Sequence, residues 1–144
     1  MSSSSPLLQA IGEIWDNDGN LTDLVPFDRM YTGLVPSTEL KRFPYVSVLQ
    51  GGTRHWFRTD KAQYSRVPVT FHIWVDDSDL ATAEAIENQI WKSYANQTWD
   101  FLYGTIMDVI DEGPGTKHQI NEPNYRAWEV VKLLTFCLMQ ERVD

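Results

Sequence analysis

The stretch "RVPVTFHIWVDD", from Arg66 to Asp77, is the strongest structural signal in this 144-residue chain. Its side chains alternate between two kinds, and alternation with a period of two is typical of a strand whose two faces have different surroundings. This stretch therefore predicts a long strand that is buried on one side. The face expected to be buried holds Val67, Val69, Phe71, Ile73 and Val75, and the other face holds Thr70, His72 and Trp74.

A helix is predicted directly after this strand, over "DDSDLATAEAIENQIWKSYANQ" (residues 76–97). Asp77 or Ser78 can cap it, and Asp79 lies in the first turn, where the helix dipole favours an anion. Since its apolar residues form one stripe, we expect the helix to lie across the sheet. The stripe consists of Leu80, Ala83, Ile86, Ile90 and Tyr94.

A second helix is predicted near the N-terminus, where the serines before Pro6 can cap it and Pro6 suits the first helical position. Its apolar residues recur at spacings of three and four, and "DNDGN" ends it with turn chemistry around Gly19. The stripe consists of Leu7, Leu8, Ile11, Ile14 and Trp15.

The remaining strands are predicted on both sides of the central one. A short strand is expected in residues 29–36 and another in residues 45–49, where Gly51-Gly52 predicts a hairpin that returns over residues 53–60. A second turn near residues 60–62 leads into the central strand. Two later strands are expected around residues 103–110 and 127–138, and the Gly- and Pro-rich stretch "DEGPGTKHQINEPN" between them is expected to be irregular.

This order of elements predicts an α+β fold. Strands in runs with segregated helices favour a single domain with a largely antiparallel sheet, on which an N-terminal helix and one central helix pack. The length fits one domain, and 42% apolar residues favour a folded globular protein.

Composition also excludes some classes. The only cysteine, Cys137, cannot form an internal disulfide and is expected to be a small buried residue. The N-terminus is not typical of a signal peptide, and no apolar run approaches the ~18–20 residues of a membrane span. We therefore expect a soluble protein made in a cytoplasm, without a membrane partner.

Few residues suggest catalysis or metal binding. His55, His72 and His118 lie on separate predicted elements without a metal-ligand spacing, and the acidic run at residues 76–79 lacks the glycine and distal Glu of a calcium loop. Asp108, Asp111 and Glu112 form another acidic group, for which a solvated strand end is the default interpretation. From the sequence we therefore expect a protein that is not an enzyme and that has no catalytic residue, no metal site and no cofactor.

The positive charge is concentrated in one segment. The chain has a formal charge of −8, yet the segment from Lys41 to Arg66 carries six of its twelve Lys and Arg residues against one acid, Asp60. The segment therefore carries +5 and the remainder −13. The residues predicted to form an interface are Lys41, Arg42, Arg54, Trp56, Arg58, Lys61 and Arg66.

Three interpretations of this segment remain open from the residues alone. Arginine with aromatic side chains can bind nucleic acid, Arg, Trp and Tyr are common anchors of protein interfaces, and two ordinary strands can simply expose a solvated basic face. The opposite charge elsewhere on the chain favours an interface, because positive and negative patches on one protomer attract each other head to tail. On this hypothesis Arg54, Trp56 and Arg58 alternate onto one side of their strand and act together.

The order of features resembles a known family. After an amphipathic helix come Leu21, Thr22 and Leu24, a strand ending at Val35-Pro36, "FPYVSV" at residues 43–48, a hairpin, and the long "VPVTFHIWVDD" strand that leads into a helix. This pattern resembles the tail-completion or tail-terminator proteins of long-tailed bacteriophages and gene-transfer particles, over roughly residues 7–94 and more loosely beyond.

The resemblance implies one tail-completion-like domain over residues 1–144. It implies a structural virion protein that forms a homo-oligomeric, six-fold ring at the head-proximal end of the tail tube. There it would stop tube polymerisation and join the tail to the neck of the head, with the tube protein and a neck protein as partners. DNA would pass through the ring without specific binding. A second possibility is that some residues of the basic segment line this channel instead of forming an interface.

Other classes remain open beside this one. The chain can be another head–tail connector or neck component, or a stand-alone α+β binding module with a concave apolar pocket. A small hydrolase-like enzyme would need Asp108, Asp111 and a histidine to converge in one cleft.

Overall fold

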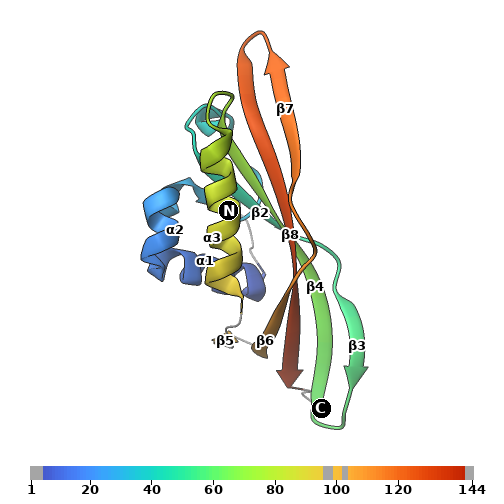
Figure 1. Cartoon of the computed structure of the whole chain (residues 1–144). Helices are drawn as coiled ribbons and strands as arrows, with labels where there is room; N and C mark the ends of the chain where they lie inside the picture. The colour runs from blue at the N-terminus through green and yellow to red at the C-terminus, as the bar shows by residue number, and fades with distance from the viewer. Residues whose placement is uncertain (1–4, 96–98, 102–103, 142–144) are drawn as a thin grey trace.

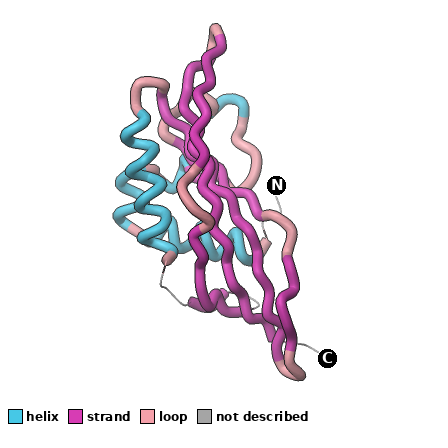
Figure 2. The backbone as a smooth tube through the Cα atoms, turned by 45° about the vertical axis from the view of Figure 1, so that its right-hand side comes forward, coloured by secondary structure: helices cyan, strands magenta, loops and turns pink. Residues whose placement is uncertain are grey.

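A computed structural model describes residues 5–95, 99–101 and 104–141 of the chain. Among these residues, three α-helices lie together on one face of an eight-stranded, mostly antiparallel sheet (Figure 1). The α+β class, the single domain and the largely antiparallel sheet predicted from the sequence are thereby confirmed. In the described part of the chain, the opposite face of the sheet carries no α-helix, and we call it the open face (Figure 2).

The helices are α1 (Pro6–Asn17), α2 (Gly19–Leu24) and α3 (Leu80–Tyr94). Two short 3₁₀ turns lie at Phe27–Arg29 and Ser37–Glu39. The strands are β1 (Met30–Tyr31), β2 (Tyr45–Gln50), β3 (Arg54–Arg58), β4 (Ala62–Asp76), β5 (Trp99–Phe101), β6 (Gly104–Asp111), β7 (Thr116–Glu122) and β8 (Tyr125–Glu141).

Two long strands form the centre of the sheet. β4 and β8 pair antiparallel from Ala62 opposite Glu141 to Asp76 opposite Ala127. Each also has two further partners, arranged end to end along its other edge: β2 and β3 pair with successive parts of β4, and β7 and β6 pair with successive parts of β8. As a result the β7–β8 hairpin projects at one end of the molecule and the β3–β4 hairpin at the other (Figure 1).

The core lies between the helices and the sheet. The predicted inward set of β4 is buried, and the apolar stripes of α1 and α3 pack against it. Two buried polar groups connect the helical layer: Trp15 Nε1 donates to the Val25 carbonyl at 3.0 Å, and the Tyr94 hydroxyl donates to the Ile11 carbonyl at 2.7 Å. Both predicted helices and the predicted central strand are therefore confirmed.

The first two helices begin with side-chain capping hydrogen bonds. The Ser5 hydroxyl accepts from the Leu8 N–H at 3.2 Å with Pro6 in the first helical position, as predicted. Asp18 ends α1 and at the same time caps α2, so Gly19 begins a short second helix that the sequence did not predict. The N-cap of α3 is Asp79 instead of Asp77 or Ser78.

The hairpin predicted at Gly51-Gly52 is wrong. β2 and β3 do not pair with each other; both run antiparallel to β4, one after the other along the same edge. The break between them lies at Pro68, whose carbonyl accepts from the Gly51 N–H at 2.8 Å. Because the N and O of a strand residue point to the same side, the missing N–H of Pro68 also faces this edge, and the ladder is interrupted there.

The stretch expected to be irregular contains β7, which pairs with β8 from Thr116 opposite Val131 to Glu122 opposite Tyr125. Its side chains are almost all exposed, so the sequence has no alternation of apolar residues that would predict the strand. The pairing with the long, apolar β8 determines its conformation. β5, a three-residue strand beside β6, was not predicted either.

Candidate functional site

The β3–β4 hairpin forms an exposed surface of positive charge and aromatic rings, which we call the hairpin surface. Trp56 and Phe57 are 55% and 45% exposed, and every residue of β3 is exposed. Arg66 stacks over the Trp56 ring at 4.2 Å, and Phe57 stacks on Tyr64 with ring centroids 4.3 Å apart. Its residues are Arg54, Trp56, Phe57, Arg58, Lys61, Tyr64 and Arg66.

The cations of the hairpin surface are available for a partner. None of Arg54, Arg58, Lys61 and Arg66 lies within ion-pair distance of a carboxylate among the side chains that the structure describes. With Asp60 at the turn, residues 54–66 carry a net charge of +3, and the remainder of the chain carries −11.

The expected alternation of Arg54, Trp56 and Arg58 is wrong. A bulge at Trp56 shifts the register, so that His55 lies opposite Ser65 but Phe57 lies opposite Tyr64. Arg54 is therefore opposite Arg66 on the open face, whereas Arg58 is opposite Gln63 on the other face. Trp56 remains on the open-face side, because the Arg66 guanidinium covers its ring.

Lys41 and Arg42 lie far from the other predicted interface residues. They precede β2, whose first residue, Tyr45, pairs with Trp74 near the opposite end of β4. Lys41 lines a surface cavity beside the β7–β8 turn and Asp76. Arg42 donates to Asp28 at 3.1 Å and to Glu39 at 3.2 Å, so that its charge is locally balanced. The basic segment of the sequence is therefore split between the two ends of the sheet.

A groove of about 590 Å³ lies on the open face at the end opposite the hairpin surface, and we call it the sheet groove. Its floor is formed by Tyr45, Ser47, His72 and Trp74 of β2 and β4. Its walls come from the loop after β1, which carries Leu34 and Leu40, and from Ile120, Glu122 and Tyr125 of the β7–β8 hairpin; Leu49 lies at its edge. The Ser47 hydroxyl donates to the Gly33 carbonyl at 2.6 Å and ties that loop to the floor.

The floor of the sheet groove is aromatic and is connected by hydrogen bonds. Tyr45 stacks on Trp74 with centroids 5.9 Å apart, and its hydroxyl hydrogen-bonds that of Tyr125 at 2.7 Å. Burial raises the pKa of Tyr45, and the hydrogen bond to Tyr125 raises it further. The His72 ring lies 3.0 Å from a carboxylate oxygen of Glu129 on β8. The alternation along β4 indicates which face points outward, but no sequence pattern indicates that a groove forms there, since its walls come from distant segments.

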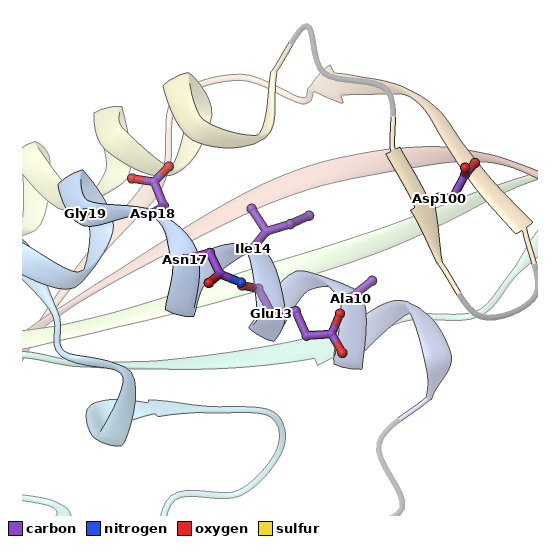
Figure 3. A pocket seen from close by; sticks show the side chains of 7 residues that line it. All are labelled: Ala10, Glu13, Ile14, Asn17, Asp18, Gly19 and Asp100. Carbon is purple, nitrogen blue, oxygen red and sulfur yellow. The ribbon is translucent and has the colours of Figure 1, made fainter.

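A second cavity, of about 580 Å³, lies between α1, the start of α2 and β5 (Figure 3). It contains three carboxylates, of Glu13, Asp18 and Asp100. Asp18 already accepts from the N–H groups of Asn20 and Leu21, and Asp100 accepts from the Thr105 hydroxyl at 2.7 Å. In Figure 3, Asp18 and Asp100 lie at opposite sides of the cavity, so the carboxylates do not converge.

The residues considered for hydrolase-like chemistry do not come together. Asp108 lies opposite Cys137 on the open face, and Asp111 lies on the helix-facing side, where Lys132 donates to it. His72 and His118 lie near Glu129, and His55 lies beside Ser65 at the other end of the sheet. Among the described residues, no three His, Cys, Asp or Glu side chains are arranged to hold a metal ion. None of the described helices is long and apolar enough to cross a membrane.

The chain is similar to a known protein in fold. No protein-family model matches the chain, and no curated protein sequence matches it. A chain in the solved structure of the virion of a native gene transfer agent particle is similar in fold, with a TM-score of 0.67 and 17% sequence identity. The likeness covers 94% of this chain and 95% of that chain, so almost the whole of the present fold is similar to one component of that particle.

Proposed function

We propose that this chain is a structural protein of a phage-like particle, a tail terminator that forms a ring at the head-proximal end of the tail tube. The observation that carries this proposal is the fold likeness to a chain of a gene transfer agent virion, which covers almost the full length of both chains. The order of sequence features that resembles tail-terminator proteins supports the same role. In this role the chain acts by assembly and not by catalysis, and its location is the virion.

The surfaces of the molecule support a ring. The cations of the hairpin surface are at one end of the sheet, and the excess of negative charge lies elsewhere on the chain. A contact between two different surfaces of identical subunits is heterologous, and such contacts close into rings when the rotation between subunits allows it. We therefore propose a homo-oligomer of six copies that stops tube polymerisation, binds the neck on its other side, and lets DNA pass through its centre.

Co-expression with the tail tube protein of the same particle tests the role. We expect tubes of uniform length with the chain at one end, detected by gold-labelled antibody in electron micrographs. Without the chain, the tubes should polymerise to variable, longer lengths. Tubes of the same length distribution in both cases, with no label at their ends, would contradict the proposal.

A neighbouring role gives a different result in the same experiment. If the chain is a neck or connector component, the label should appear on heads that lack tails, and tube length should not depend on the chain. Negative-stain images of heads and of tubes, prepared separately, distinguish the two roles.

A further inference from the structure

We propose that the hairpin surface of one copy inserts its exposed rings into the sheet groove of the next copy. This inference deepens the proposed ring and rests on it, because it names the two surfaces that join neighbouring subunits. The rings of the hairpin surface and the sheet groove lie on the same open face of the sheet, at opposite ends of β4.

Each surface exposes apolar area that a partner could cover. Trp56 is 55% and Phe57 is 45% exposed, and aromatic rings of this size each bury ~150–250 Å² when they are covered. The sheet groove is open and mainly apolar, and its wall residue Leu34 is 95% exposed. Its volume of about 590 Å³ lies within the ~300–1,000 Å³ of pockets that enclose drug-sized molecules, so two aromatic side chains can enter it.

The charges of the two surfaces are complementary. The hairpin surface carries its arginines beside the rings, with Arg54 and Arg66 on the open face. The groove is lined by the carboxylate of Glu122, and no Lys or Arg is among its described lining residues. Arginine and tryptophan side by side are typical anchors of protein interfaces, where charge also steers the two partners together.

The hairpin cannot reach the groove of its own chain, so the occupant that we propose is a second copy. Tyr64 and Trp74 are ten residues apart on one strand, a separation of roughly 33 Å at ~3.3 Å per residue. Both positions are fixed by continuous pairing of β4 with β8. An identical chain, with a groove of the right chemistry and an excess of negative charge, is the partner that the surfaces fit.

Complementation between two variants tests this contact. Trp56→Ala removes the anchor from the hairpin, and Leu49→Arg places a cation at the groove edge, where Leu49 is 39% exposed. We expect each variant alone to self-associate about 10- to 100-fold more weakly than the wild type. A mixture of the two should form a 1:1 dimer and nothing larger, because only one intact hairpin and one intact groove can meet.

The controls use native mass spectrometry of the full chain, with circular dichroism to verify folding. Met107→Ala removes an exposed side chain on β6 that belongs to neither surface, since Met107 is 46% exposed, and it should assemble as the wild type does. A binding assay with a short DNA duplex accompanies each variant. If Trp56→Ala lowers DNA affinity but leaves self-association unchanged, the hairpin surface binds nucleic acid and the inference is overturned.

The outcomes separate this inference from the proposed ring. A wild-type hexamer with complementation supports both, and a wild-type dimer with complementation supports the contact but contradicts the ring. A hexamer that survives both substitutions overturns the contact and leaves the ring. A wild type that stays monomeric at about 0.5 mM also overturns the contact, because that concentration detects even a millimolar Kd, while a ring that closes only on its tube would remain.

Discussion

Lys132 is a buried cation in the middle of β8, on the side of the sheet that faces the helices. Its side chain is 4% exposed, and its amine donates to the Asp111 carboxylate and to the Gly113 carbonyl. A buried ammonium is stable only when such partners replace water. Lys132 therefore fixes the turn between β6 and β7 against the central strand, a role that its position in an apolar stretch of sequence did not indicate.

Two substitutions distinguish the contributions of Asp111 and Lys132 to stability. Asp111→Asn leaves the buried ammonium without its counter-ion, and we expect the free energy of unfolding to fall by about 2 kcal/mol. Lys132→Met keeps most of the volume and leaves Asp111 hydrated, since that side chain is 36% exposed, so a loss under about 1 kcal/mol is expected. Urea unfolding measures both, and equal losses would show that burial of Lys132 is not the reason.

The same pair makes stability depend on pH. Burial raises the pKa of Asp111, but hydrogen bonds from Lys132 and the Gly113 N–H outweigh it and hold the pKa below its usual value of 3.8. As pH falls, the unfolded chain takes up the proton first, so the contribution of Asp111 is complete above 3.8 and is lost as pH falls toward the folded-state pKa. The stability difference between wild type and Asp111→Asn should therefore shrink below this value. A difference that persists unchanged at pH about 2 would argue against the ion pair.

At the scale of elements, the junction between β2 and β3 depends on one glycine. A Cβ on Gly51 would lie 2.8 Å from Pro68 Cγ and 3.3 Å from Pro68 O, whereas a Cβ on Gly52 would have no heavy atom within 4 Å. Gly51→Ala should therefore lower the free energy of unfolding by ~1–3 kcal/mol through overpacking. Gly52→Ala, the matched control, should change it by less than about 0.5 kcal/mol or increase it slightly. Thermal unfolding distinguishes the two, and similar melting temperatures would contradict this account of the junction.

The bulge in β3 gives two neighbouring arginines different roles. Arg54 lies on the open face with Arg66, and Arg58 lies on the opposite face. If the open face makes the contact between copies, Arg54→Glu should weaken self-association by about tenfold or more, and Arg58→Glu should have a clearly smaller effect. Both substitutions change the charge by the same amount, so each serves as the control for the other. Equal effects in sedimentation experiments would mean that charge alone, and not the face of the sheet, governs the contact.

At the scale of the whole molecule, the charge is divided between one hairpin and the remainder. Residues 54–66, which include Asp60, carry +3 in a chain of −8, so contacts between copies should be strengthened by attraction between unlike charges. Salt screens exposed charges, with a Debye length of ~10 Å at 0.1 M. Self-association measured by native mass spectrometry at two ionic strengths should therefore weaken as salt rises. An oligomer indifferent to salt would indicate that the aromatic insertion supplies nearly all of the affinity.

Much of this architecture could be predicted because its signals are local. The period of two in β4 and the stripes in α1 and α3 each record which face is buried, and Ser5 with Pro6 records where a helix begins. The concentration of cations between Lys41 and Arg66 was equally visible. Local patterns of this kind are sufficient to establish an α+β domain and to draw attention to one basic hairpin.

The elements that bury an apolar face can be predicted from local sequence, since burial imposes a periodic pattern on the residues concerned. Which strands pair, and which side chains they expose, depends on contacts between distant parts of the chain. β7 is a strand because it pairs with β8. Gly51-Gly52 does not form a hairpin turn but connects β2 to β3 along the same edge of β4, at the point where Pro68 interrupts the ladder. The separation of Lys41 from Arg54 and the assembly of the sheet groove likewise depend on pairings between residues far apart in the chain, which no local pattern records.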